Sequence, residues 1–191
     1  MAKRAYDFIL AGLGLLLIWP LLLVLGAIIK VFDGNPVLFR QTRIGRRRQP
    51  FEILKFRTMR ANAERAGPSV TQAGDPRVTP IGRWLRKRKL DELPQLWNVF
   101  TGDMSLVGPR PERPEFVDEL RKQISYYDER HSVRPGLTGW AQVKYRYGSN
   151  IEDAIRKLEF DLFYLKNMSI FFDCAIILDT VRIVTRGEGG Q

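Results

Sequence analysis

The chain has 191 residues, enough for one domain with a hydrophobic core, and its 31 lysines and arginines against 21 acidic residues give a net charge of +10. A single cysteine, Cys174, excludes an internal disulfide and a cysteine-based zinc cluster, and the single His131 leaves little material for a His-rich metal site. The basic balance predicts an anionic partner, which could be nucleic acid, an acidic membrane surface or a phosphorylated substrate.

The chain begins with a long uncharged segment. Residues 8–29 contain no charged side chain, and this is about the length needed to cross a hydrocarbon core of roughly 30 Å. The run is longer than a typical signal-peptide core, and no clear small-x-small cleavage site follows it. We therefore expect a membrane anchor that continues directly into the folded domain rather than a cleaved leader.

Positive charge flanks this segment on both sides. Lys3 and Arg4 precede it, and Lys30 follows it, so the positive-inside rule favours a cytoplasmic location for both ends. Pro20, near the middle, lacks a backbone donor and can break the helix. The sequence thus favours a re-entrant membrane helix over residues 1–32, broken at Pro20, followed by a cytoplasmic domain over residues 33–191. A spanning anchor with a mild kink is the alternative.

After the anchor, the pattern predicts a turn at 33–36, a β-hairpin and then mainly helices. The two strands of the hairpin are expected over 37–43 and 51–58. A short helix is expected over 61–66, and the stretch 67–80, with its glycines and prolines, is typical of a loop that could act as a lid. Further helices are expected over 81–90, 93–100, 114–127, 151–167 and 170–184. The predicted fold class is α+β and mostly α-helical.

The later helices carry apolar stripes that allow two interpretations. As amphipathic helices they could lie at the membrane interface, with their basic sides near lipid headgroups. Alternatively, the same stripes make the core of the domain, and for any single helix we favour this second interpretation.

Two adjacent carboxylates, Asp91 and Glu92, follow a strongly basic segment that includes Arg86. Surface ion pairing is the common role of such a pair. Phosphoryl transfer, however, needs a nucleophile, a divalent cation and positive charge around the phosphates, and an aspartate can form an acyl phosphate. Pro94 disfavours the helical conformation at Leu93, so the pair is expected at a helix boundary.

Three further segments offer cations that could bind phosphate. Arg110 stands between two prolines, which stiffen its backbone. Arg134 precedes Pro135 in a glycine-containing segment whose Trp140 could stack on a base. Lys55 and Arg57 lie on a predicted strand, where alternation would place them on one face. Solvated loops and a solvated sheet face are the alternatives, and only the joint occurrence of these segments makes a site.

Four motifs in this order resemble the bacterial sugar transferase family of monotopic, polyprenyl-phosphate phosphoglycosyl transferases. They are Lys-Phe-Arg-Thr-Met at 55–59, Leu-Asp-Glu-Leu-Pro-Gln at 90–95, Gly-Asp-Met-Ser-Leu-Val-Gly-Pro-Arg-Pro at 102–111, and Arg-Pro-Gly-Leu-Thr-Gly-Trp-Ala-Gln at 134–142. The resemblance extends over nearly the whole chain. It implies a re-entrant helix broken near Pro20, although the better-known small members have Ser-Pro where this chain has Trp19-Pro20.

The resemblance also implies a reaction and its residues. Asp91 would be the nucleophile that attacks the β-phosphate of a UDP-sugar, releases UMP and holds a phosphosugar, which polyprenyl (undecaprenyl) phosphate then accepts. Glu92 would complete a catalytic dyad, with Mg²⁺ as cofactor and Asp91 as its ligand. Arg86 and Arg110 match positions expected to contact phosphate or nucleotide.

Several expectations complete this hypothesis. Arg134 and Gln142 are further candidates for nucleotide contact. The stretch 143–148 resembles exopolysaccharide-type members, which favours glucose or galactose over N-acetylated sugars. The expected location is the cytoplasmic face of the bacterial inner membrane, with membrane lipids but no nucleic acid as partners, and with a homo-oligomer and downstream glycosyltransferases left open. The extra N-terminal membrane domain of larger relatives is expected to be absent. A membrane-tethered basic binding or scaffold protein without catalysis is the alternative.

Overall fold

The computed structural model describes residues 2–60, 63, 74–145 and 150–186. Two short sheets and a majority of helical segments confirm the α+β, mostly helical fold class. The elements are α1 (Ala2–Phe32), β1 (Leu38–Ile44), η1 (Arg46–Arg48), β2 (Pro50–Phe56), α2 (Pro80–Lys87), η2 (Leu90–Glu92), α3 (Gln95–Thr101), β3 (Ser105–Val107), α4 (Pro114–Gln123), η3 (Tyr127–His131), β4 (Gly136–Thr138), α5 (Trp140–Lys144), α6 (Ile151–Lys166) and α7 (Ile170–Thr185). The predicted helix over 61–66, except for residue 63, and residues 67–73 of the predicted loop over 67–80 lie outside the described residues. The rest of that loop contains a bridge between Val78 and Met59, and its last residue, Pro80, begins α2.

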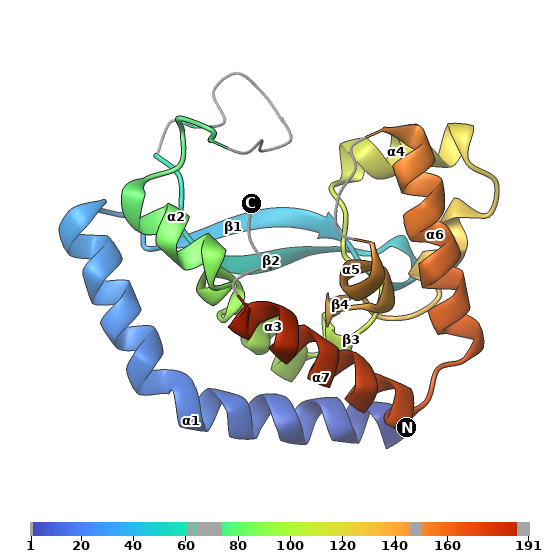
Figure 1. The fold of residues 1–191 in the computed structure, drawn as a ribbon, viewed down its shortest axis with the longest axis horizontal. Helices are drawn as coiled ribbons and strands as arrows, with labels where there is room; N and C mark the ends of the chain where they lie inside the picture. Colours follow the sequence, from blue (N-terminus) through green and yellow to red (C-terminus); the bar gives the residue numbers. More distant parts are fainter. Residues whose placement is uncertain (1, 61–62, 64–73, 146–149, 187–191) are drawn as a thin grey trace.

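Helix α1 is a long apolar helix with a bend. Its length and composition would let it cross a bilayer, and its outer side chains are exposed, with Leu17 at 78%. The ribbon turns near its middle, so that two arms wrap one side of the domain (Figure 1). Pro20 lies inside the helix in this middle region, and its missing donor accounts for a bend at this point.

Both ends of α1 are tied to the same body. At its start, the Arg4 guanidinium donates to the carbonyls of Val99 (2.6 Å) and Phe100 (2.7 Å) in α3. Just beyond its end, the Arg57 guanidinium donates to the carbonyls of Asp33 (2.5 Å) and Gly34 (2.7 Å). A straight crossing would place these two ends on opposite sides of a bilayer. The tethering therefore favours the re-entrant geometry, which stays a prediction together with the division at residue 32.

A buried polar cluster fixes the first turn of α1. Lys3 Nζ lies 2.5 Å from Asp173 Oδ2 in α7 and 4.0 Å from Asp7 Oδ1. Asp7 also accepts from the Ser105 hydroxyl (2.8 Å) and from the Leu106 amide (3.1 Å) at β3. Both carboxylates are almost fully buried, so a cation and several donors are needed to hold their charge.

Replacing the cation of this cluster tests its contribution. We expect Lys3→Met to lower the free energy of unfolding by roughly 2–4 kcal/mol, because it leaves buried carboxylates without their counter-charge. Urea unfolding in detergent micelles measures the change. Lys30→Met, which removes an exposed lysine at the other end of α1, is the matched control and should be near neutral. Equal effects of the two substitutions would contradict the argument.

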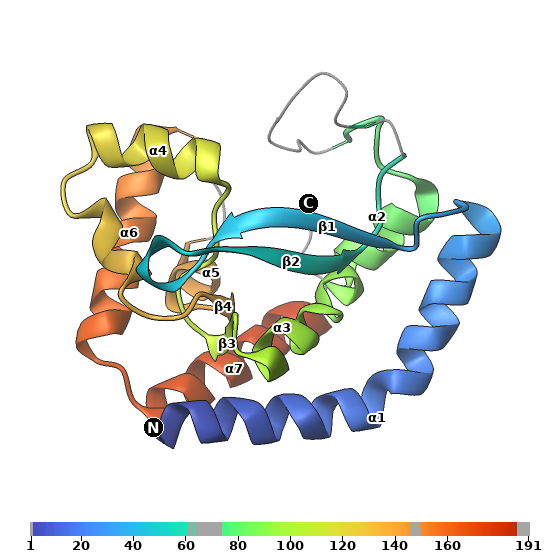
Figure 2. The ribbon, with the colours of Figure 1, turned by 180° about the vertical axis from the view of Figure 1, so that it is seen from behind.

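The predicted β-hairpin is confirmed, and it carries part of the site. β1 and β2 pair antiparallel from Leu38 opposite Phe56 to Ile44 opposite Pro50. Helix α3 lies along the free edge of β2, where the Asn98 side chain accepts from the Leu54 amide (3.0 Å) and donates to the Glu52 carbonyl (2.8 Å). Seen from behind, the hairpin crosses the middle of the domain, with α2 at one end and α4 and α6 at the other (Figure 2).

A second sheet was not expected from the sequence. β3 and β4 form a short parallel pair, with Ser105 opposite Gly136 and Val107 opposite Thr138. The two segments meet so closely that a Cβ on Gly136, the first residue of β4, would lie 2.1 Å from the nitrogen of Gly108, which follows β3. Glycine is therefore required for this contact. The glycines at 136 and 139 bring two motif segments together rather than opening space for a ligand.

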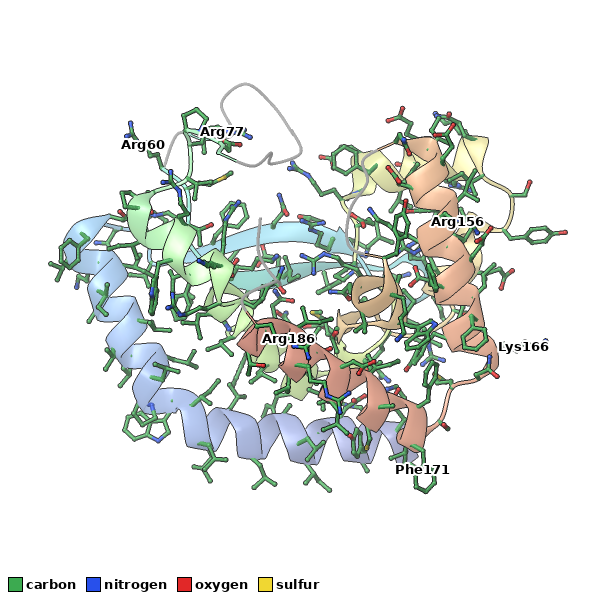
Figure 3. All side chains as sticks on the ribbon, viewed as in Figure 1. Arg60, Arg77, Arg156, Lys166, Phe171 and Arg186 are labelled. Atoms are coloured by element: carbon green, nitrogen blue, oxygen red, sulfur yellow. The ribbon has the colours of Figure 1, made fainter. Side chains whose placement is uncertain are left out.

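The remaining predicted helices are present as α2, α3, α4, α6 and α7, most of them shorter than expected. Their inner faces form the core, as in the cluster of Val117, Tyr127 and Leu158. Some apolar side chains stay exposed, and the largest exposure is that of Phe171, 88%, which projects away from the domain next to the first turn of α1 (Figure 3). The core interpretation thus holds for the inner faces, and an interfacial role for the outer ones stays a prediction.

Candidate active site

The acidic pair lies on a tight turn between two helices. Helix α2 begins at a Thr79 cap, whose hydroxyl accepts from the Gly82 amide, and it ends at Lys87. Lys89 then adopts a left-handed conformation with φ 56°, which reverses the chain into the single turn η2 that holds Asp91 and Glu92. The prediction that the pair lies at a helix boundary is confirmed. Both carboxylates are 8% exposed.

One carboxylate oxygen of Glu92 accepts hydrogen bonds from two cationic side chains. Glu92 Oε1 accepts from Lys55 Nζ (2.9 Å) on β2 and from an Arg110 nitrogen (2.8 Å) in the Pro-Arg-Pro segment. Burial opposes ionisation of Glu92, but Arg110, Lys55 and Lys89 outweigh it and hold the pKa of Glu92 well below its usual range. Glu92 is therefore an ionised anchor for two cations. Burial lowers the pKa of Lys55, and the charge of Glu92 partly offsets this effect.

Asp91 differs from its neighbour because one of its two carboxylate oxygens has no hydrogen-bond partner among the described residues. Its Oδ1 is buried without a hydrogen-bond partner. Burial, together with the adjacent charge of Glu92, raises the pKa of Asp91, while Lys55, Lys89 and Arg86 act in the opposite direction. Two neighbouring carboxylates with opposite pKa shifts are suited to different tasks: Glu92 holds charges in place, and Asp91 is free to react.

Arg86 lines the same site from α2. Its Nε donates to the Thr58 hydroxyl (2.8 Å), which orients the guanidinium. Burial lowers the pKa of Arg86, and Asp91 is the largest opposing influence, followed by Asp75 and Glu92. The structure therefore brings together Asp91, Glu92, Arg86, Arg110 and Lys55, five of the eight predicted catalytic or phosphate-binding residues.

The other three predicted residues contact backbone groups elsewhere. The guanidinium of Arg57 donates to the carbonyls after α1, whereas Lys55 binds Glu92. The Arg57 amide still bonds the Val37 carbonyl next to the hairpin (2.9 Å), so the two side chains differ in their partners although the strand pairing reaches Arg57. Arg134 donates to the Gly102 carbonyl (2.7 Å), at the opposite end of α3 from the acidic pair. Gln142 lies on α5, within 3.5 Å of the Leu137 carbonyl.

Trp140 also differs from its expectation. Its ring stacks on Phe163 of α6 and meets Phe172 of α7 edge-on, with centroid separations of 6.2 Å and 5.0 Å. The Nζ atom of Lys144 lies over the Trp140 ring, 4.6 Å from its centroid. The indole is thus held within an aromatic cluster that joins three helices, and this arrangement does not present it to a base.

Gln95 belongs to the site but was not predicted. It follows Asp91 by four residues, and Leu93 and Pro94 between them are helical, so the two side chains share one face of the turn. Gln95 is 2% exposed, and its Nε2 is buried without a hydrogen-bond partner. The i, i+4 spacing in the motif at 90–95 was the available signal.

An unpartnered buried amide should cost stability. We expect Gln95→Leu to raise the free energy of unfolding by about 1 kcal/mol, since it removes a buried polar group that forms no hydrogen bond. Asn98→Leu, one helical turn further on, is the matched control and should destabilise, because Asn98 bonds the edge of β2. Chemical unfolding of both variants decides the matter; a destabilised Gln95→Leu protein would show that the amide is satisfied in solution.

The residues fit a magnesium ion that arrives with a substrate. Among the described residues, no group of three or more His, Cys, Asp or Glu side chains could hold a metal. Magnesium, however, is commonly held by one or two carboxylates together with phosphate oxygens and water. The unpartnered oxygen of Asp91 can supply one such ligand. The surrounding cations disfavour a bare metal ion, so a diphosphate would have to contribute the remaining negative charge.

The sequence model of the bacterial sugar transferase family matches residues 1–187. The chain belongs to this family. It is 43% identical over 99% of its length to UDP-N-acetylgalactosamine-undecaprenyl-phosphate N-acetylgalactosaminephosphotransferase of Aeromonas hydrophila, and covers 45% of that protein. It is 44% identical over 95% of its length to UDP-glucose:undecaprenyl-phosphate glucose-1-phosphate transferase of Escherichia coli (strain K12), and covers 39% of it.

A third relative has almost the same length as this chain. The exopolysaccharide production protein PSS of Rhizobium leguminosarum bv. phaseoli is 40% identical over 98% of this chain, which covers 97% of that protein. The chain therefore spans less than half the length of the first two relatives and nearly all of the third.

Proposed function

We propose that this bacterial sugar transferase moves a sugar-1-phosphate from a UDP-sugar to undecaprenyl phosphate through a covalent intermediate on Asp91. The observation that carries the proposal is the contrast within the acidic pair: Asp91 is buried without a partner beside Glu92, which holds two cations. The names of the Aeromonas hydrophila and Escherichia coli relatives, which describe sugar-phosphate transfer from a UDP-sugar to undecaprenyl phosphate, support the same reaction.

The first step forms the intermediate. A carboxylate oxygen of Asp91 attacks the β-phosphorus of the UDP-sugar, the bond from that phosphorus to the bridging oxygen breaks, and UMP leaves with the bond electrons. The product is an acyl phosphate that carries the sugar. Arg110, Lys55 and Arg86 supply the positive charge that the diphosphate requires.

The second step regenerates the enzyme. A phosphate oxygen of undecaprenyl phosphate attacks the same phosphorus, the bond to Asp91 breaks, and the carboxylate is released. The product is undecaprenyl diphosphate sugar. Glu92 keeps Lys55 and Arg110 in place through both steps, since its hydrogen bonds do not depend on the ionisation of Asp91.

The lipid acceptor explains the membrane helix. Its phosphate stays at headgroup depth because its tail lies in the hydrocarbon region, so the reacting carboxylate has to be held at the same depth. A re-entrant α1 with both ends tied to the domain would fix this depth. The expected location is the cytoplasmic face of the inner membrane, and the basic surface would attract anionic lipid and substrates.

Turnover with purified components tests the proposal. The full chain in detergent is mixed with Mg²⁺, undecaprenyl phosphate and, separately, UDP-glucose, UDP-galactose or UDP-N-acetylgalactosamine, and released UMP is quantified. Intact-protein mass spectrometry without acceptor should show one added sugar-phosphate. If none of the UDP-sugars gives UMP release and no adduct forms, the proposal is rejected, and a basic binding or scaffold protein is favoured.

Removal of the metal should stop the first step. Magnesium supplies charge neutralisation to the diphosphate when it is bound. We therefore expect EDTA to reduce UMP release by at least about 100-fold, with recovery after excess Mg²⁺ is added. Far-ultraviolet circular dichroism in EDTA should be unchanged, because Lys55 and Arg110, rather than a metal, hold Glu92 in the folded protein. Metal-independent turnover would contradict the prediction.

A further inference from the structure

The segment that carries Arg110 is held by an unbroken row of hydrogen bonds. All four consecutive carbonyls at 109–112 accept a bond, and the donors come from three separate elements, β4, η3 and β1. The donors, in order, are the Gly136 amide (2.9 Å), Arg130 Nη2 (3.0 Å), Arg43 Nη1 (3.1 Å) and the Ile44 amide (2.9 Å). Because Pro109 and Pro111 also fix their own φ angles, this backbone is immobilised.

Arg130 is the donor that reaches the carbonyl of Arg110 itself. It is 7% exposed, and besides this bond it donates to the Tyr127 hydroxyl (2.7 Å) and pairs with Asp161 Oδ2 of α6 (2.9 Å). Asp161 is 2% exposed. The pair therefore lies behind the Arg110 backbone, while the Arg110 side chain extends to Glu92 on the other side and keeps 37% exposure.

Stability alone gives a weak reason for such a pair. A buried ion pair can often be replaced by apolar side chains of similar size without loss of stability. A fixed backbone, by contrast, is what a phosphate-binding guanidinium needs, because a displacement of about 1 Å can cost about 100-fold in rate.

We propose that the buried pair Arg130–Asp161 is a positioning pair, which holds the Arg110 backbone so that its guanidinium meets the diphosphate of the nucleotide sugar. This inference rests on the proposed function and assigns a role to η3 and α6, which supply no group to the acidic pair. Arg130 acts through Arg110 and does not touch substrate.

The test is a double-mutant cycle with UDP as the probe, since UDP carries the diphosphate but no sugar to transfer. Three proteins are compared with the parent: Arg110→Gln, the apolar pair Arg130→Met/Asp161→Leu, and their combination. Arg156→Gln/Glu159→Gln is the control, because it removes an exposed ion pair from the same helix; Arg156 lies on the outer side of α6 (Figure 3). UDP affinity is measured by calorimetry in detergent, and thermal unfolding of each protein is recorded.

We expect Arg110→Gln to weaken UDP binding about 10–50-fold and the apolar pair to weaken it about 5–10-fold. The combination should be no weaker than Arg110→Gln alone, because residues that act through one group are not additive. The control should bind UDP as the parent does.

Fully additive effects, or normal UDP affinity in the apolar-pair protein, would overturn the inference and leave the proposed function intact. If Arg110→Gln itself binds UDP normally, the proposed role of Arg110 fails as well. Should the apolar pair not fold, Arg130→Lys replaces it: one ammonium keeps the charge beside Asp161 but cannot reproduce the forked contacts, and the same non-additivity with Arg110→Gln is expected.

Discussion

Asp91→Asn is expected to show no covalent sugar-phosphate adduct and to reduce UMP release by at least about 10⁴-fold. The amide cannot form the acyl phosphate, and no other described carboxylate lies unpartnered at this position. Glu92 cannot substitute, because Lys55 and Arg110 hold its oxygen at 2.9 Å and 2.8 Å. UMP release and intact-protein mass spectrometry measure the two effects.

Two controls accompany this variant. Asp118→Asn removes an exposed carboxylate on α4, which pairs with Arg48, and should leave turnover unchanged. UDP binding by the Asp91→Asn protein should be retained or slightly strengthened, since a negative charge near the diphosphate is lost. Residual adduct on the Asn variant would place the nucleophile elsewhere.

The same carboxylate predicts a pH dependence. The reactive form is the ionised one, and burial with the charge of Glu92 raises the pKa of Asp91 above its ordinary value of 3.8. The rate of adduct formation should therefore fall as the pH drops through a value above 3.8, and it should recover when the pH is raised. Single-turnover measurements across this range in mixed buffer give the midpoint.

Glu92→Gln should lower both stability and activity. A neutral amide leaves Lys55 and Arg110 without the oxygen that both contact. We expect the free energy of unfolding to fall by roughly 2–4 kcal/mol, toward the lower end because the Arg110 side chain keeps part of its exposure. Adduct formation should fall by about 100-fold or more, since both phosphate-binding cations lose their anchor.

The matched control for Glu92→Gln lies on β2, the strand that also carries Lys55. Glu52→Gln removes an exposed carboxylate of β2 that lies 3.5 Å from Arg40, and it should change stability by less than about 0.5 kcal/mol. In Glu92→Gln, the remaining pH dependence should move toward lower pH, because the charge that raises the pKa of Asp91 is gone. Denaturant unfolding and single-turnover rates report the two quantities; an unchanged stability would show that the two cations are solvated.

Local features of the sequence were enough for the long apolar helix, the hairpin and the position of the acidic pair. The uncharged run at 8–29 predicts a long apolar helix because helix length follows directly from residue count. Pro20 predicts a local break because its effect is confined to one turn, and the structure shows a bend within one continuous helix. Pro94 predicts a helix boundary at Asp91 and Glu92. The boundary is present, but Leu93 is helical and the left-handed Lys89 forms the boundary, so the physical reason differs from the predicted one. Each of these predictions depends on neighbours within a few residues.

Contacts between distant segments could not be predicted in this way. Lys55 and Arg110, 37 and 18 residues from Glu92, converge on one oxygen, whereas Arg57, two residues from Lys55, turns to the end of α1. The parallel pair β3–β4 and the row of bonds behind Arg110 also join segments far apart in the chain.

The sequence by itself determined the chemistry that was available: a carboxylate pair, several cations and a long apolar helix with a proline near its middle. Only the tertiary structure decided that Glu92 is occupied by two cations, that Asp91 is left free, and that Arg134 and Trp140 serve other segments. The physical reason is that a side chain's partner depends on how separate elements pack and in which register. Residue type and spacing along one chain do not specify either.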